Sequence, residues 1–116
     1  MADVLISLGS NYHQAAHIQW ASERLSHLLS DVRYSQKRWT PDIHHRGIWY
    51  MNRLAVAKTS ISVEDLEHAL KAIEAETLRT PDRVTIDLDL MQYNNRLFHM
   101  KDWSRSYIQQ LIGDII

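Results

Sequence analysis

Residues 83–91 read Arg-Val-Thr-Ile-Asp-Leu-Asp-Leu-Met, and this stretch decides the fold. Its apolar and polar side chains alternate with the period of two that is typical of a β-strand. One face of the predicted strand carries Val84, Ile86, Leu88 and Leu90. The opposite face carries Thr85, Asp87, Asp89 and Met91. We therefore expect the aliphatic face to pack on a core and the two carboxylates to point away from it.

Asp87 and Asp89 form a pair of acids on one face of this strand. Their α-carbons are expected about 6 to 7 Å apart, so their oxygens can converge on one ligand. Two such charges side by side repel each other, and a divalent cation relieves the repulsion. Magnesium is typically held by one or two carboxylates together with substrate phosphates. The alternation fits a solvated polar edge equally well, so the residues alone leave both interpretations open.

Composition sets limits on the class of protein. With 116 residues, 45% apolar and 23% charged, the chain has the values of one globular domain with one core. A formal charge of -1 disfavours binding to nucleic acid or to an acidic membrane. The chain has no cysteine, and we find no signal peptide and no apolar run of transmembrane length. We therefore expect a cytoplasmic protein.

Further elements are predicted on both sides of the acidic strand. Strands are expected at 4–8, from 31 to 40 and at 48–58, with a polar loop at 41–47. Helices are expected from the Gly9-Ser10-Asn11 turn to about residue 30, and from the Ser62 cap to about residue 77. A terminal helix over 102–112 is predicted to have an apolar side made of Trp103, Tyr107, Ile108 and Leu111.

The resulting order is β-α-β-β-α-β plus a C-terminal helix. It predicts an α+β protein, a ferredoxin-like α/β sandwich with an antiparallel sheet, both helices on one face and the other face free. In this fold the aliphatic side of the acidic strand lies beneath the helices. Asp87 and Asp89 are then expected on the open face.

Three motifs together resemble the 6-hydroxymethyl-7,8-dihydropterin pyrophosphokinase (HPPK) family. They are Leu-Ile-Ser-Leu-Gly-Ser-Asn at 5–11, Thr40-Pro41 followed by Tyr50-Met51-Asn52, and Thr-Ile-Asp-Leu-Asp-Leu at 85–90. The combination is more specific than any one motif. The resemblance covers about residues 3–94 of a single domain, 1–116, and leaves 95–116 as a divergent C-terminal segment.

The resemblance implies a transferase of folate biosynthesis. In that family the hydroxymethyl oxygen of the pterin attacks the β-phosphorus of ATP, pyrophosphate is transferred and AMP is released. Asp87 and Asp89 would hold two magnesium ions that bridge the ATP phosphates. ATP and a small pterin are thus the implied partners, with no nucleic acid and no membrane. The oligomeric state is open, with a homodimer as one alternative.

The same resemblance assigns a substrate site. Asn52 would hydrogen-bond the pterin edge with an amide that both donates and accepts. Tyr50 would line the pocket, and Thr40 and Pro41 would form part of its wall. From the residues alone, Asn52 and Tyr50 are equally ordinary strand residues, and a Thr-Pro pair often marks only the end of a strand.

Glu74, Arg79, Arg83 and Leu90 are assigned by the resemblance to the nucleotide side. Ile73-Glu74 matches the family pair at the end of the second helix, and Arg79 falls near the family's catalytic arginine. A planar guanidinium suits the charge that develops on transferred phosphates. The alternative for Arg79 is a cation at a helix C-terminus.

The loop before the acidic strand departs from the family pattern. Leu78 replaces a glycine, Val84 stands where the family has its last arginine, and the loop is several residues shorter and has no Trp. These departures favour a second hypothesis, a catalytically impaired pterin- or nucleotide-binding homologue. A third, an RNA-binding or regulatory module of similar topology, is opposed by the net charge and the Asp pair. Catalysis predicts that Arg79 and Arg83 point toward Asp87 and Asp89.

Overall fold

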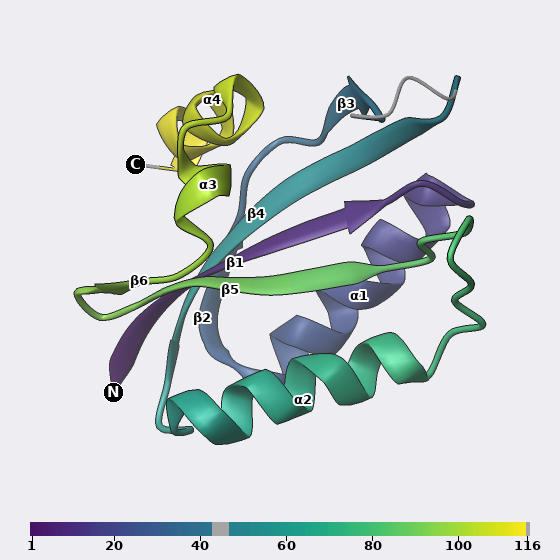
Figure 1. Cartoon of the computed structure of the whole chain (residues 1–116). Coiled ribbons are helices and arrows are strands. Elements are labelled where there is room, and N and C mark those ends of the chain that lie inside the picture. The colour runs from purple at the N-terminus through teal and green to yellow at the C-terminus, as the bar shows by residue number, and fades with distance from the viewer. Residues whose placement is uncertain (43–46, 116) are drawn as a thin grey trace.

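The computed structural model describes residues 1–42 and 47–115, which form a six-stranded sheet with helices on both faces (Figure 1). Its strands are β1 (Ala2–Ser10), β2 (Ser30–Tyr34), β3 (Arg38–Pro41), β4 (Trp49–Thr59), β5 (Asp87–Tyr93) and β6 (Arg96–Leu97). Its helices are α1 (Gln14–Leu28), α2 (Val63–Ala75), α3 (Met100–Trp103) and α4 (Ser106–Ile115).

The strands pair in the order β2-β4-β1-β5-β6, and β3 also pairs with β4. All of these pairings are antiparallel. Helices α1 and α2 lie together on one face of the sheet (Figure 1). The predicted α+β, ferredoxin-like fold with an additional C-terminal helix is therefore confirmed.

The main core lies between the sheet and these two helices. Leu88 and Leu90 of β5 are at most 3% exposed and pack with Ile6 and Leu8 of β1 beneath the helices. Ile18 and Leu25 of α1, and Leu66 and Leu70 of α2, complete this cluster. Ser62 caps α2, since its Oγ accepts a hydrogen bond from the Asp65 amide at 3.2 Å. The aliphatic face predicted for the acidic strand is thus the buried face.

From the sequence we had predicted that the opposite face of the sheet is free. This prediction is wrong, because α4 covers part of that face. Helix α4 packs on it through Ile108 and Leu111, which form a second core with Leu5, Leu54 and Met91. Met91 shares the face of Asp87 and Asp89, as the alternation predicts, and α4 buries it to 1% exposure. The part of this face beside the two carboxylates stays open.

Three element boundaries differ from the sequence prediction. The strand expected from 31 to 40 is divided into β2 and β3. Between them the Ser35 Oγ accepts a hydrogen bond from the Leu54 amide, and this side-chain contact interrupts the backbone pairing with β4. Strand β5 begins at Asp87, because the backbone of Val84 is bound to Asn11 instead of to a neighbouring strand. The terminal helix expected at 102–112 is two helices, α3 and α4.

Candidate active site

A pocket of about 660 Å3 opens on the sheet face that α4 partly covers. Its floor is β1, which contributes Ser7 and Gly9. One wall comes from β3 and β4 and contains Thr40, Pro41, Asp42, Tyr50 and Asn52. Another comes from β5, with Asp87 and Asp89. The C-terminal segment closes the pocket with Asp102, Arg105, Ser106, Tyr107 and Ile108.

Strand pairing fixes the distance between the two walls. Gly9 of β1 lies opposite Asn52 on β4 and opposite Asp87 on β5. Asn52 and Asp87 are therefore two strands apart, about 9.5 Å between backbones, in one row across the sheet. A β-carbon at Gly9 would lie 3.6 Å from the Asn52 Oδ1 and 3.9 Å from the Tyr50 ring. The absence of a side chain at Gly9 thus keeps the floor open between an amide and a carboxylate.

Burial raises the pKa values of the two acids. The pKa of Asp87 is raised above its usual range, first by burial and then by the nearby charge of Asp89, while Arg79 opposes the shift. Burial also raises the pKa of Asp89, and His99, 3.8 Å from its Oδ1, opposes the shift. Burial thus disfavours the charged forms of both carboxyl groups, and groups shifted in this way are common at functional sites.

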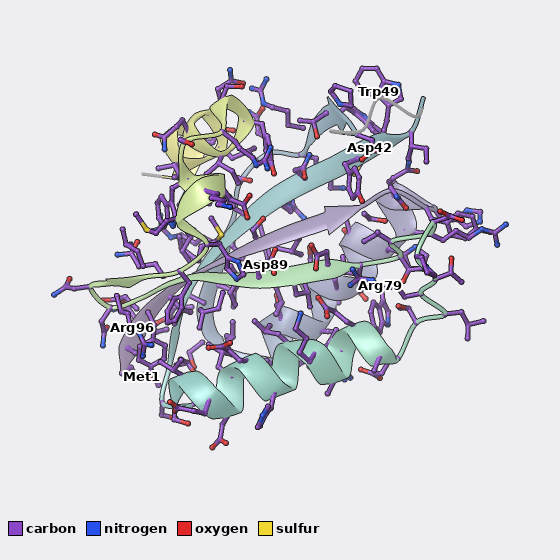
Figure 2. All side chains as sticks on the ribbon, in the orientation of Figure 1. Met1, Asp42, Trp49, Arg79, Asp89 and Arg96 are labelled. Atoms are coloured by element: carbon purple, nitrogen blue, oxygen red, sulfur yellow. The ribbon has the colours of Figure 1, made fainter. Side chains whose placement is uncertain are left out.

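Arg79 lies next to Asp87, the first acid of the pair, and Figure 2 shows where it lies relative to Asp89. Its Nη1 is 3.6 Å from the Asp87 Oδ1 and 3.8 Å from a carboxylate oxygen of Glu74, and it donates to the Ile86 carbonyl at 3.4 Å. Its side chain is 40% exposed, so these ion pairs are partly screened by solvent. The guanidinium therefore stays accessible to a ligand while it is directed toward Asp87.

Glu74 is almost fully buried and holds the outer edge of β5. Its Oε2 accepts a hydrogen bond from the Leu88 amide at 2.7 Å, and Lys71 lies 3.2 Å from its Oε1. A side chain thus provides the partner that a neighbouring strand would otherwise give this edge. Glu74 therefore holds β5 at Leu88, the residue that separates Asp87 from Asp89.

Arg83 and Leu90 do not face the carboxylate pair. The Arg83 guanidinium stacks on the Tyr12 ring, 4.7 Å from its centroid. The Leu90 side chain is 3% exposed and belongs to the core beneath the helices, so it contacts no ligand in the pocket. Of the two arginines expected at Asp87 and Asp89, only Arg79 is directed toward them.

The substrate residues expected from the sequence lie together on the β3–β4 wall. Thr40 pairs with Tyr50 across the two strands. The Asn52 Nδ2 donates to the Thr40 Oγ1 at 2.7 Å and to the Arg38 carbonyl at 3.3 Å. Because both Nδ2 hydrogens have acceptors, the amide orientation is fixed and its Oδ1 faces the pocket floor.

The C-terminal segment brings to the pocket groups that no sequence motif had indicated. Arg105 pairs with Asp102 at 2.9 Å, and both line the pocket beside the carboxylates of β5. Burial, followed by the Asp102 charge, raises the pKa of Tyr107. Tyr107 was predicted as part of an apolar helix side, but no motif distinguished Arg105. Only the docking of α4 on the sheet reveals their place.

The fold and pocket define a class: a ferredoxin-like domain whose partly covered sheet face holds a carboxylate pair, a guanidinium and an amide wall. The family model described as 7,8-dihydro-6-hydroxymethylpterin-pyrophosphokinase (HPPK) matches residues 5–116. The chain therefore belongs to the HPPK family, whose members are transferases of folate biosynthesis that use ATP and a pterin. The match includes the C-terminal segment beyond residue 94. The search of curated proteins finds none that matches the chain.

No helix in the described ranges 1–42 and 47–115 is long and apolar enough to cross a membrane.

Proposed function

We propose that this chain catalyses magnesium-dependent transfer of pyrophosphate from ATP to 6-hydroxymethyl-7,8-dihydropterin, with release of AMP. The observation that carries the proposal is the row Asn52–Gly9–Asp87 across the sheet. It supports a pterin on the amide wall and the ATP phosphates beside the carboxylates, with the two ligands neighbours on one open floor. Direct transfer between them requires such proximity.

The pterin would lie against the β3–β4 wall. The oriented Asn52 amide presents its Oδ1 to an N–H group of the heterocycle, and Thr40 and Pro41 form the wall beside it. Tyr50 from β4 and Tyr107 from α4 bring aromatic rings to two sides of the same pocket. Flat rings favour stacking on aromatic side chains, so these two tyrosines are suited to a bicyclic ligand.

Asp87 and Asp89 are the groups that would hold magnesium. Their oxygen donors fit a hard cation. Burial raises the pKa of both carboxyl groups, so a bound cation would favour their charged forms. When bound, magnesium supplies charge neutralisation and alignment of the ATP phosphates. Two ions remain the number we propose, from the resemblance stated above.

Arg79 and Arg105 supply the positive charge for the phosphates. Arg79 comes from the loop that follows α2 and Arg105 from the residue directly before α4, and each side chain is more than one third exposed. In the reaction the pterin hydroxymethyl oxygen forms a bond to the β-phosphorus, and the bond from that phosphorus to the α,β-bridging oxygen breaks. AMP leaves with the bridging oxygen, and the hydroxymethyl group loses its proton. The arginines would stabilise charge on the transferred group.

A second candidate is a homologue that binds pterin or nucleotide without turnover. The engagement of Arg83 with Tyr12 favours it, because this arginine is then absent from the carboxylate pair. Leu78, 92% exposed in the same segment, provides no packing that would direct Arg83 inward.

Formation of AMP from ATP, 6-hydroxymethyl-7,8-dihydropterin and magnesium distinguishes the two candidates. We expect AMP in equal amount to the pterin diphosphate, and none without pterin or after chelation of magnesium. Pterin binding without AMP formation at high enzyme concentration would instead support the binding homologue.

A further inference from the structure

Ser7 is a half-buried residue of the pocket floor that has no role in the proposed reaction so far. It belongs to β1, the strand that lies between β4 and β5 in the sheet (Figure 1). Its hydroxyl makes no hydrogen bond to any residue in the described ranges 1–42 and 47–115. Because a hydroxyl can donate one hydrogen bond and accept two, this group is free to bind a ligand in the pocket.

Strand pairing places Ser7 directly beside one acid of the carboxylate pair. Ser7 lies opposite Asp89 on β5 and opposite Leu54 on β4. The β-carbons of residues that face each other in an antiparallel pair are about 4.5 to 5.5 Å apart. This row lies two residues along each strand from the row that runs from Asn52 to Asp87. The Ser7 hydroxyl is therefore directly opposite Asp89 and only diagonal to Asp87.

The neighbours of Ser7 restrict the groups that its hydroxyl can meet. On the β4 side, Leu54 is fully buried and packs with Ile108 of α4 in the second core. That side of Ser7 is therefore apolar. On the β5 side, the Asp89 side chain is 25% exposed and lines the pocket. A polar partner of the hydroxyl must therefore lie on the Asp89 side, where the proposed magnesium ion would bind.

The chemistry of magnesium gives a hydroxyl at this place a function. A magnesium ion bound by carboxylates and phosphates usually keeps several waters, and these waters need hydrogen-bond acceptors. Groups that hold the ligands of a metal from behind often determine how tightly the metal binds. We propose that Ser7 is a positioning residue for magnesium, and that its hydroxyl accepts a hydrogen bond from a water on the ion held at Asp89. This inference rests on the proposed function, and it adds a neutral group from β1 to the two carboxylates of β5.

The test measures how much magnesium contributes to nucleotide binding. The ligand is α,β-methylene-ATP, which cannot be cleaved at the reacting bond, so the measurement does not depend on turnover. It is titrated into each protein by isothermal titration calorimetry, once with excess magnesium and once with EDTA. Wild-type protein is expected to bind the analogue more tightly with magnesium, because the ion joins the phosphates to the carboxylates of β5.

Ser7→Ala removes the hydroxyl and is expected to weaken binding about three- to tenfold with magnesium and by less than about twofold with EDTA. Ser7→Thr keeps a hydroxyl at the same place and is expected to stay within about twofold of wild type in both conditions. Ser60→Ala removes the same atom at an exposed position before α2 and is the matched control, with no change expected.

Equal weakening of Ser7→Ala with magnesium and with EDTA would overturn the inference, because the hydroxyl would then act on the nucleotide or on the fold. Unchanged binding by Ser7→Ala, or loss of the magnesium-dependent part in Ser7→Thr, would overturn it as well. Each of these results leaves the proposed function standing. A wild-type affinity that does not depend on magnesium would instead refute the proposed magnesium site, and the inference with it.

Discussion

Strand β5 lines the pocket and the segment 77–84 brings Arg79 beside Asp87, but different forces hold these two parts of the chain. In β5, Leu88 and Leu90 are buried beneath the helices and the backbone pairs with β1. In the preceding segment Leu78 is 92% exposed, and polar contacts such as those between Asn11 and Val84 hold the chain. The core therefore positions the carboxylates, whereas the arginines depend on weaker contacts that a ligand can rearrange.

The largest effect on turnover is expected from a substitution in β5, the strand that the core holds in place. Asp89→Asn should lower magnesium-dependent turnover by roughly a thousandfold or more, because the magnesium site loses one of its two carboxylates. AMP formation measures this, and circular dichroism should show an unchanged fold. Asp114→Asn is the matched control. Turnover within threefold of wild type in Asp89→Asn would refute the metal role of this residue.

The two arginines in residues 77–84 should differ in how much their removal lowers catalysis. Arg79→Ala should lower kcat/KM about a hundredfold, because its guanidinium lies at Asp87, where phosphate charge would develop. Arg83→Ala should cost about fivefold or less, since Arg83 contacts Tyr12 at the surface. Steady-state AMP formation compares the two variants. A larger loss in Arg83→Ala would mean that the segment rearranges when ligands bind.

Glu74→Ala should weaken the attachment of β5 on its outer edge. Removal of the carboxylate leaves the buried Leu88 amide without its partner and should lower the free energy of unfolding by about 1 to 3 kcal/mol. Urea unfolding measures this change. Glu67→Ala, at an exposed position of α2, should change stability by less than about 0.5 kcal/mol. Equal effects of the two substitutions would show that the edge contact adds no stability.

The smallest effect is a pH-dependent change in thermal stability without magnesium. Because the folded state raises the pKa of Asp89, its protonation stabilises the fold. That stabilisation is full below the ordinary aspartate pKa of 3.8 and is lost as pH rises through the raised folded value. Asp89→Asn should therefore unfold a few degrees above wild type at neutral pH, with the difference vanishing toward pH 4.

Calorimetry of both proteins at several pH values checks this prediction. Magnesium should raise the midpoint of wild type and not that of Asp89→Asn. A variant less stable than wild type at neutral pH would contradict the view that burial disfavours the charged form of Asp89.

Features that depend on a local sequence pattern could be predicted from the sequence. The alternation in residues 83–91 was sufficient to assign Leu88 to the core and Asp87 to the opposite face, because side chains alternate across any strand. The wall of Thr40 and Asn52 followed from a family motif, and the strand pairing brings these two residues into contact.

Contacts between segments that are distant in the chain could not be predicted from the sequence. Residues 106–115 have an apolar side, but periodicity does not specify which surface covers it, so the places of Arg105 and Tyr107 were missed. Likewise, nothing local indicated that Asn11 binds the backbone of Val84 and delays the start of β5. Asp42 was one acid in a polar loop, and only the continued β3–β4 pairing places it in the pocket wall.

A single-turnover experiment tests the central claim most directly, because it removes product release and low affinity as causes of inactivity. Enzyme in excess is mixed with limiting ATP labelled at the α-phosphorus, saturating 6-hydroxymethyl-7,8-dihydropterin and magnesium, and labelled AMP is followed in time. We predict conversion of all ATP to AMP in one exponential phase that requires both pterin and magnesium. Bound pterin with no AMP beyond the pterin-free control would contradict the claim that this pocket transfers pyrophosphate.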